Sequence, residues 1–540
     1  MKAKRVFLPI LLALCLVFSI LTGCASKPGT DSDTSQGTDT ETGKDTKSSE
    51  TPPQEEKKEP VTLAWWYRGN GEQADTAKVE DKVNEMLKSY KGLEHVSIDL
   101  NCYAASDYAT QVTLAQTAGK QMDILNTVTI SFTEQVKNGT YIPLDDYLAE
   151  MPELTDTLPE WLLDLGKIDG VTYMIPHYQQ AANMPGITTP KKYLDQYGDE
   201  EKIRKTVNNP DSTIAEKAEV LKEYLLAVRE GEGETKYAPR LAFLNEPYYD
   251  DLYYNTPVPI RIYEGTTEAV YAPLSDLYKE AYEMAAKWYT EGLVHPDPTI
   301  DYETTLVKKN MLNDVSAAFD GNHFIGSEDY ASAKMSKQYG FDVVAIATKD
   351  HYYINNYWAA GGDGVTASSQ HPEEAIKFIE AMNIERGKEI YNTIVYGIEG
   401  VHYEKIDDTH IKTLGYDGSQ GGSDYLYSAH KWIMGNTFNA WFNQGSSEED
   451  LKIAKEINES PDTVASSLMG LVLDTEPITT ELSQIAAVHT EYKDALEYGN
   501  MGDGWEAYYE EYKDKIQKAG IEKVLKVIQE QIDEFVAKNK

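Results

Sequence analysis

Short apolar runs alternate with helical patterns just after residue 60, and this alternation constrains the fold more than any other feature. The runs 61–70 (VTLAWWYRGN), 95–103 (HVSIDLNCY) and 122–130 (MDILNTVTI) are typical of strands. The stretches 75–91 and 107–119 between them are predicted as helices, the first with its apolar residues on one face. Strands that alternate with helices favour a parallel sheet, because parallel neighbours need a crossover connection. We therefore predict an α/β fold.

Helical patterns dominate the rest of the chain. A helix opens at His371-Pro372-Glu373, where proline suits the first helical turn. The other predicted helical regions are 190–240, 274–291, 301–312, 481–498 and 521–535. A chain of 540 residues with this content suits two or three domains.

The first 24 residues have the pattern of an export signal. Lys2, Lys4 and Arg5 precede an apolar run from Val6 to Ile20, which is too short to span a bilayer comfortably. Leu21-Thr22-Gly23-Cys24 follows and resembles the bacterial lipobox. The resemblance implies that residues 1–23 are a lipoprotein signal peptide and that Cys24 is lipidated. The alternative is an ordinary secreted protein with a chance cysteine.

The segment 25–60 contains no aromatic residue and no Leu, Ile, Val or Met. Such a segment has too little apolar surface to form a core. We predict that 24–60 forms a lipidated cysteine and a disordered tether, which holds a folded region near the outer face of the cell membrane.

Charge and cysteine content exclude several classes of function. The chain has 50 basic and 89 acidic side chains, a formal net charge of −39. Such a surface repels phosphate backbones and anionic lipids, so we expect no nucleic-acid partner and no charge-driven membrane binding. Cys102 is the one cysteine beyond the N-terminal segment, so no intramolecular disulfide is expected there. Tyrosine outnumbers phenylalanine by 38 to 11, which suits either a polar-ligand cleft or an ordinary surface.

The order of these elements resembles the extracellular solute-binding lipoproteins of carbohydrate-type ABC importers, in a large Gram-positive group. Two departures from the family pattern are Val171-Thr172, where Gly-Lys is frequent, and His323, where Trp is common. The stretches that carry the resemblance are VTLAWW, DILNTVTISFTEQVKNGTYIPLDDYL, IDGVTYMIPHY, VSAAFDGNH, GVTASSQHPEEAIKFIEAMN, YGIEGVHYE, LDTEPITTELSQIAAVHTEY and AGIEKVLKVIQEQIDEF.

The resemblance implies a two-lobe, periplasmic-binding-protein-like fold of the type II kind, with hinge strands and extra C-terminal helices. We expect lobe 1 to comprise 61–176 plus 355–400, and lobe 2 to comprise 177–354 plus 401–540. The ligand would bind in the cleft between the lobes.

Candidate ligand-binding residues follow from where the predicted strands end, since open parallel sheets bind ligands beyond the carboxyl ends of their strands. Alternation along the first strand, 61–67, places Trp65 in the core and leaves Trp66, Tyr67 and Arg68 as candidates. Flat aromatic rings and charged donors suit the faces and hydroxyls of sugars. For each candidate, packing or turn capping is the alternative. The further candidates are Asn126, Tyr178, Gln179, Asp320, Asn322, Trp358 and Asp363.

Catalytic and cofactor motifs have little support in the sequence. GDGVTA at 362–367 matches a dinucleotide fingerprint by letters, but the next helix begins only at Pro372. No HExxH, GxSxG or GxxxxGK[ST] motif occurs. We therefore expect no metal, no cofactor and no catalysis.

Together these observations predict a monomeric, membrane-anchored extracellular solute-binding protein. It would capture a small-molecule solute, with an oligosaccharide as the expected class, and deliver it to ABC permease subunits. Two alternatives remain. A surface glycoside hydrolase would use a pair among the 89 acidic residues. A sensor subunit would present its ligand to a signalling receptor.

Overall fold

The computed structural model describes most of the chain after residue 57. Residues 1–57 lie outside the described part, and with them Cys24, the predicted signal peptide and most of the predicted tether. No helix within the described ranges is both long and apolar enough to cross a bilayer. The described ranges are 58–233, 247–252, 258–296, 318–320 (backbone only), 325–355, 361–415, 426–444, 446–471 and 473–538.

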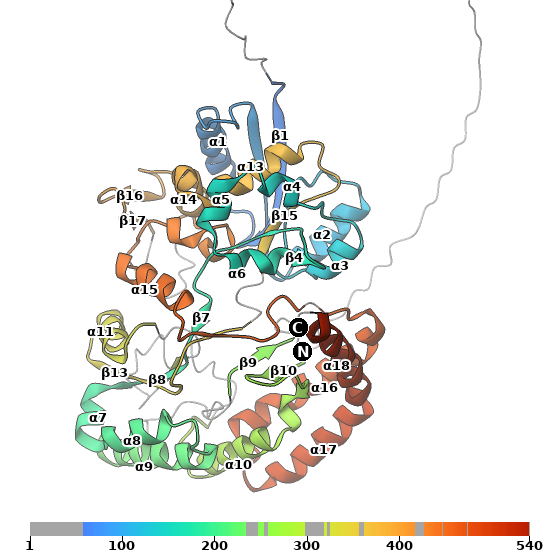
Figure 1. The fold of residues 1–540 in the computed structure, drawn as a ribbon. Helices are drawn as coiled ribbons and strands as arrows, with labels where there is room; N and C mark the ends of the chain where they lie inside the picture. The colour runs from blue at the N-terminus through green and yellow to red at the C-terminus, as the bar shows by residue number, and fades with distance from the viewer. Residues whose placement is uncertain are drawn as a thin grey trace, which may run out of the picture. The chain divides into compact units, whose positions relative to one another are not determined.

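A five-stranded sheet of order β2-β1-β3-β15-β6 organises the N-terminal part (Figure 1). Its first three strands are parallel, as the sequence predicts, and β15 runs antiparallel to both β3 and β6. The helices α1 (Thr76–Leu87) and α2 (Tyr108–Thr117) are the crossovers that the parallel strands require. The strands are β1 (Val61–Gly69), β2 (Val96–Ala104), β3 (Ile124–Asn126), β6 (Ile175–Pro176) and β15 (Gly362–Val365).

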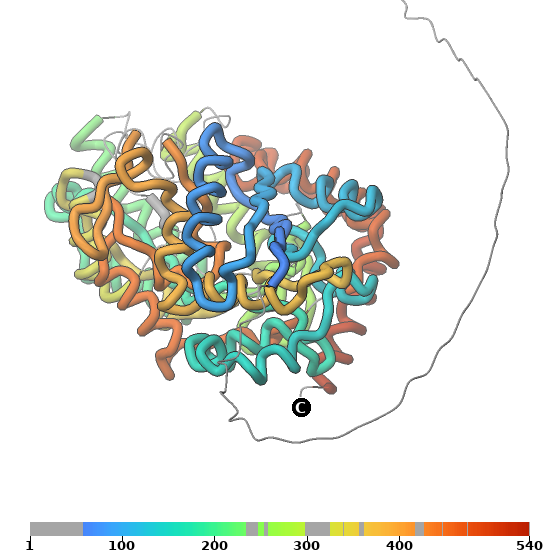
Figure 2. The backbone as a smooth tube through the Cα atoms, turned by 90° about the horizontal axis from the view of Figure 1, so that it is seen from above, coloured from blue at the N-terminus to red at the C-terminus, as the bar shows by residue number. Residues whose placement is uncertain are grey.

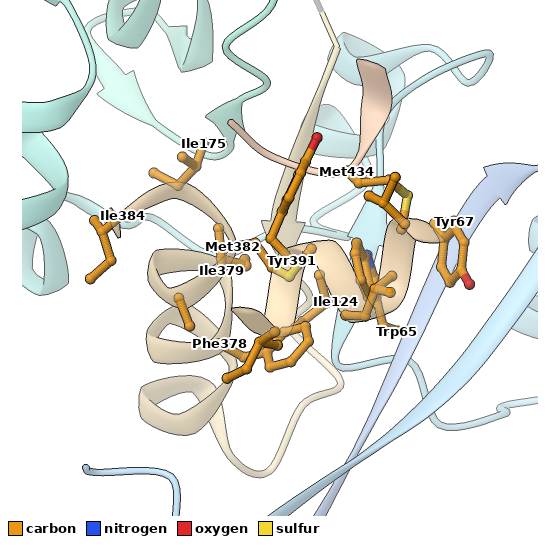
Figure 3. Close-up of a cluster of buried hydrophobic side chains, with 14 of the residues drawn as sticks. Trp65, Tyr67, Ile124, Ile175, Phe378, Ile379, Met382, Ile384, Tyr391 and Met434 are labelled. Atoms are coloured by element: carbon orange, nitrogen blue, oxygen red, sulfur yellow. The ribbon is translucent and has the colours of Figure 1, made fainter. Parts of the chain in front are cut away.

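The two faces of this sheet bury different clusters. On one face Val61, Leu63, Trp65 and Tyr67 pack against α1, α13 (Pro372–Asn383) and α14 (Lys388–Tyr396). Figure 3 shows Trp65 beside Phe378 of α13, and the two rings meet edge to face at 5.5 Å. On the other face Ala64 and Trp66 pack against α2. The alternation of β1 thus divides its apolar side chains between two cores.

The first core also includes residues that the sequence analysis assigned to lobe 2. Tyr403, Ile411, Tyr427, Met434 and Trp441 belong to the same buried cluster as Trp65. They come from β16 (Tyr403–Lys405), β17 (Ile411–Thr413) and the irregular segment after them. The apolar side chains of this stretch cover α14, which lies beside α1 (Figure 2). The lobe boundaries, with the one expected at 400 among them, stay a prediction.

A second, antiparallel sheet has the order β12-β8-β13. Its apolar residues pack against a group of helices. These helices confirm the helical prediction over 190–240 as far as Glu232. The capping box of Thr213 and Glu216 fixes the start of the longest of these helices, α9. The elements are β8 (Gly186–Pro190), β12 (Ala318–Asp320), β13 (Val343–Ala347), α7 (Lys191–Tyr197), α8 (Glu200–Val207), α9 (Ile214–Glu232) and α11 (Glu328–Tyr339).

A helical region closes the chain. The helices predicted over 274–291, 481–498 and 521–535 are confirmed, whereas α17 was not predicted and 301–312 lies outside the described residues. The stripe of Val524, Ile528 and Ile532 is buried, as amphipathic spacing requires. The elements are β9 (Tyr249–Asp251), β10 (Ile260–Tyr263), β11 (Val270–Tyr271), α10 (Asp276–Thr290), α16 (Thr479–Tyr498), α17 (Trp505–Lys518) and α18 (Ile521–Lys538).

Short strands connect these regions, in a sheet of order β18-β14-β7. They are β7 (Ala182–Asn183), β14 (Tyr353–Ile354) and β18 (Val464–Ala465), and α15 (Glu448–Asn458) precedes the last of them. The remaining elements are α3 (Phe132–Lys137), α4 (Asp145–Leu148), α5 (Pro152–Thr157), α6 (Glu160–Leu163), β4 (Lys167–Ile168), β5 (Val171–Thr172) and several single 3-10 turns.

Candidate ligand-binding site

Trp66 and Tyr67 do not lie where the sequence analysis placed them. Strand β1 continues to Gly69, so both residues belong to the sheet and face its two cores. Tyr67 is 1% exposed beside Trp65, and Trp66 is 3% exposed. The Trp66 ring stacks on Tyr103 at 5.1 Å between ring centroids, and its Nε1 donates to the Gln121 carbonyl at 3.1 Å. The expectation that these two rings form cleft walls is wrong, while the core position of Trp65 is confirmed.

Asn126 and Asp363 lie together where β3 and β15 pair, with His177 beside them. All three side chains are buried. Asp363 Oδ1 accepts from Trp65 Nε1 at 3.0 Å and from Asn126 Nδ2 at 3.2 Å. Asp363 Oδ2 lies 3.0 Å from His177 Nε2. Residues from β1, β3, β15 and the end of β6 therefore form one polar cluster at one edge of the sheet.

The donors around Asp363 fix the orientation of its neighbours. The Val128 backbone N–H donates to Asn126 Oδ1 at 3.0 Å, so the amide nitrogen of Asn126 faces the carboxylate. An ionised carboxylate only accepts, so His177 Nε2 carries the proton in this contact. The other ring nitrogen, His177 Nδ1, is buried and has no hydrogen-bond partner. A neutral His177 ring thus presents a free acceptor.

Arg68 and His430 form a second polar group at the end of β1. The side-chain nitrogens Arg68 Nε and His430 Nδ1 are both buried without a partner. Burial lowers the pKa of His430, and the positive charge of Arg68 lowers it further. Asn70 Nδ2 donates to the Ser428 carbonyl at 2.9 Å and holds the segment before His430 at this strand end.

The same segment joins the two groups. Asn126 Nδ2 lies 3.4 Å from the Ile433 carbonyl oxygen, so residues 428–433 run from the end of β1 to the end of β3. Thr129, just beyond β3, has φ of 70° and a buried hydroxyl without a partner. A β-branched residue in this region is strained, and such strain concentrates at functional sites. We call Arg68, Thr129, His177 and His430 the unpartnered group.

Of the remaining candidates, Tyr178 and Gln179 follow His177 directly and bond to the end of α15. Tyr178 is buried, and its hydroxyl donates to Glu459 at 2.5 Å. The Gln179 carbonyl accepts from Asn458 Nδ2 at 2.7 Å. These contacts attach residues 178–179 to the end of α15. Asp320 ends β12 and only its backbone is described, while Asn322 and Trp358 lie outside the described residues.

Sequence reasoning missed three members of the unpartnered group. His177 stands between Pro176 and Tyr178, and its position next to a strand end was the available signal. Thr129 and His430 lie in irregular segments, where no periodicity marks a functional side chain. Within the described ranges, no three His, Cys, Asp or Glu side chains gather in a way that could hold a metal ion.

A family model and one curated relative match the chain. The family model is described as "Domain of unknown function (DUF3502)" and matches residues 467–537. The relative is a "Carbohydrate ABC transporter substrate-binding protein" from Streptococcus pneumoniae, 22% identical over 469 residues that cover 85% of this chain and 89% of the relative.

Solved structures show the same fold. The crystal structure of the N-glycan transport solute binding protein NgtS from Streptococcus pneumoniae is 18% identical, with a TM-score of 0.67, and the match covers 89% of this chain and 100% of NgtS. The complex of NgtS with Man1GlcNAc is 18% identical, with a TM-score of 0.59, over 88% of this chain and 100% of that one. The α/β fold class and the family resemblance expected from the sequence are thereby confirmed. The chain is a distant homologue of a carbohydrate ABC transporter substrate-binding protein over most of its length, and it has the α/β solute-binding protein fold of NgtS.

Proposed function

We propose that this protein is the solute-binding component of an ABC importer and that it binds an oligosaccharide without altering it. The homology over 469 residues to a protein named for carbohydrate transport carries the proposal. NgtS, which shares the fold, has been crystallised with Man1GlcNAc. The polar edge of the five-stranded sheet supports the same function, because sugar hydroxyls both donate and accept hydrogen bonds.

The unpartnered group supplies what such a ligand needs. His177 Nδ1 accepts from a sugar hydroxyl, and Asp363 and Asn126 act as positioning residues that hold the His177 ring. Arg68 and the Thr129 hydroxyl add donors at neighbouring strand ends. A buried polar atom without a partner costs free energy, which a bound ligand would offset. The ligand would favour a closed arrangement of two lobes, which the permease recognises.

Residues 58–540, which form one compact unit, serve for the test. A thermal-shift screen against neutral and charged oligosaccharides should find a stabilising ligand. A ligand at 100 times its Kd stabilises the folded state by about 2.7 kcal/mol. His177→Gln and Asp363→Asn should reduce the stabilisation by that ligand. Gln444→Ala should not, because Gln444 bonds to Thr413 outside the polar cluster. If peptides or polyamines stabilise and no saccharide does, the proposed ligand class is wrong.

The same preparation tests the hydrolase alternative. Bound oligosaccharide should be recovered intact after long incubation, with mass spectrometry as the readout. Cleavage that depends on a single carboxylate would favour the hydrolase. The sensor alternative differs in its partner, so copurification with permease subunits in a membrane extract distinguishes it from an importer component.

We also propose that Cys24 carries a lipid that anchors the protein at the outer face of the cell membrane. The lipobox-like sequence before Cys24 and the apolar-poor segment 25–60 support this. In a Gram-positive host, Cys24→Ala should release the protein or leave an unprocessed precursor. Processed protein that stays with the membrane fraction would place the anchor elsewhere.

A further inference from the structure

We infer that the end of β1 binds an anionic group of the ligand, so that the preferred saccharide carries a negatively charged oxygen group such as a carboxylate. This inference rests on the proposed function and adds the charge of the ligand to it. The observation behind it is a half-buried guanidinium, Arg68, that has no counter-charge among the residues the structure describes.

Arg68 differs from the other arginines in the described ranges. Its Nε is buried without a hydrogen-bond partner, and it forms no ion pair with any described residue, although acidic side chains outnumber basic ones by 89 to 50 in the full chain. Chance would give an arginine in such a chain an acidic neighbour more readily than none. The other described arginines are all engaged: Arg204 by Glu200 and Glu328, Arg261 by Asp251, Arg386 by Glu153, and Arg229 by the carbonyls of Glu291 and Gly292.

The nearest strand-end carboxylate is not available to Arg68. Asp363 already accepts from Trp65, Asn126 and His177. Its charge is therefore held by three donors within the polar cluster. Among the described residues, no carboxylate forms an ion pair with the guanidinium at the end of β1.

His430 adds a second nitrogen-bearing side chain near this strand end. Its ring is half-buried, and among the described residues its Nδ1 has no hydrogen-bond partner. Burial and the charge of Arg68 lower its pKa, which favours the neutral ring. Asn70 and Gln73 both donate to the Ser428 carbonyl, at 2.9 and 3.0 Å, so the segment that carries His430 is fixed at this strand end. Arg68 and His430 thus stand on two separate segments that hydrogen bonds hold together at the end of β1, which favours a fixed site over a loose surface arginine.

An anionic oxygen group fits this pair better than a neutral hydroxyl. A guanidinium donates in a fixed fork that matches carboxylate oxygens, and such bonds are about twice as strong as neutral ones. A hydroxyl would satisfy one donor and leave the charge unbalanced. The net charge of −39 does not forbid this, because exposed charges are screened beyond about 8 Å at physiological ionic strength.

Matched pairs of saccharides test the inference on residues 58–540. We would titrate trigalacturonate against galactotriose, C6-oxidised cellotriose against cellotriose, and sialyllactose against lactose, by calorimetry at 0.15 M salt. At least one acidic member should bind roughly tenfold to a hundredfold more tightly than its neutral counterpart. Arg68→Met should remove this preference, and Arg68→Lys should retain part of it. The control Arg386→Met removes the same charge at an exposed ion pair and should leave the preference unchanged.

The outcomes separate the inference from the proposed function. If a neutral saccharide binds as tightly as its acidic counterpart and Arg68→Met leaves its Kd unchanged, the inference is wrong and the proposed function stands. If no saccharide of any pair binds, both fail. If acetate or sulfate alone displaces the acidic saccharide at equal concentration, the site binds free anions and the inference fails. Unfolding curves for both Arg68 variants establish that each is folded.

Discussion

Two buried clusters of histidine and polar side chains lie in different parts of this molecule, and they differ in one respect. In the C-terminal helical region, His489 Nδ1 bonds to the Tyr512 hydroxyl at 2.7 Å, which bonds to the Tyr271 hydroxyl at 2.7 Å. At the edge of the five-stranded sheet, His177 Nδ1 and Arg68 Nε have no partner. The first cluster completes its hydrogen bonds within the protein, and the second does not.

This difference separates polar clusters that stabilise the fold from polar clusters that are available to bind a ligand. A paired buried donor contributes modestly to stability, whereas an unpaired one costs about 1–3 kcal/mol. The helical region has exceptions of its own, among them the Tyr282 hydroxyl and Asn500 Oδ1. The sheet edge brings several unpaired atoms to neighbouring strand ends, which is the arrangement expected where a ligand supplies the missing partners. The predictions below test this division.

The largest effect is expected at Trp65, where core and site meet. Trp65→Ala removes a fully buried ring that packs on Phe378 and also removes a donor to Asp363. The free energy of unfolding should fall by about 3–5 kcal/mol in urea. Trp161→Ala, at a half-buried ring, is the matched control and should cost less. A loss below that of the control would mean that this face of the sheet is not the main core.

The pH dependence of the free energy of unfolding should reveal the cluster of His489, Tyr512 and Tyr271, which we call the closed cluster. Burial lowers the pKa of His489 to about 4, with Lys493 and Arg261 adding to the shift. The folded pKa is depressed, so protonation favours the unfolded state, and stability present above pH 6.5 is lost as the pH falls towards 4. Between pH 7.5 and 5.0 this loss should be about 2 kcal/mol.

His489→Gln provides the control, because glutamine still bonds to Tyr512 but does not titrate. The variant should lose about 2 kcal/mol less than the wild type over the same pH interval. Equal losses in urea titrations of the two proteins would show that His489 is not buried in its neutral form.

A smaller effect, a gain rather than a loss in the free energy of unfolding, is expected at Thr129. Its φ of 70° is strained for a β-branched residue but is accessible to glycine. Thr129→Gly should raise the free energy of unfolding by about 1 kcal/mol and weaken ligand binding, because the unpartnered hydroxyl is lost. The exposed Thr117→Gly, at the last position of helix α2, should instead destabilise slightly, by about 0.3 kcal/mol. Stabilisation without any loss of binding would place the strain outside the site.

The sequence predicted the layers of this molecule better than its site. Helix and strand patterns located β1, β2, β3, α13 and α18 because burial of one face dictates periodicity. Strand ends also led the sequence analysis to Asn126 and Asp363, which the structure brings together, and their role in ligand binding stays a prediction.

The site predictions that were wrong or missing concern residues whose contacts lie far apart in the sequence. Trp66 and Tyr67 were misplaced because β1 continues past 67 and its core covers both. His430 joins Arg68 only because residues 70 and 428 are hydrogen-bonded, and no local pattern reports a contact 358 residues away. The contact of Trp441 with Tyr396, on opposite sides of the predicted boundary at 400, is likewise tertiary and leaves no local pattern.

The smallest expected effect is a change in the free energy of unfolding whose sign should differ between Arg68, in the candidate site, and Arg386, outside it. Arg68→Met keeps the apolar stem of the side chain and removes a half-buried charge that has no partner in the protein. Without ligand, the free energy of unfolding should rise by up to about 1 kcal/mol, since binding residues are commonly retained at a cost in stability. Arg386→Met breaks an exposed ion pair with Glu153 and should lower it by about 0–1 kcal/mol. Urea unfolding of both variants at one pH provides the comparison. A loss of stability in Arg68→Met larger than in Arg386→Met would mean that Arg68 has a structural partner, and the sheet edge would then resemble the closed cluster around His489 rather than differ from it.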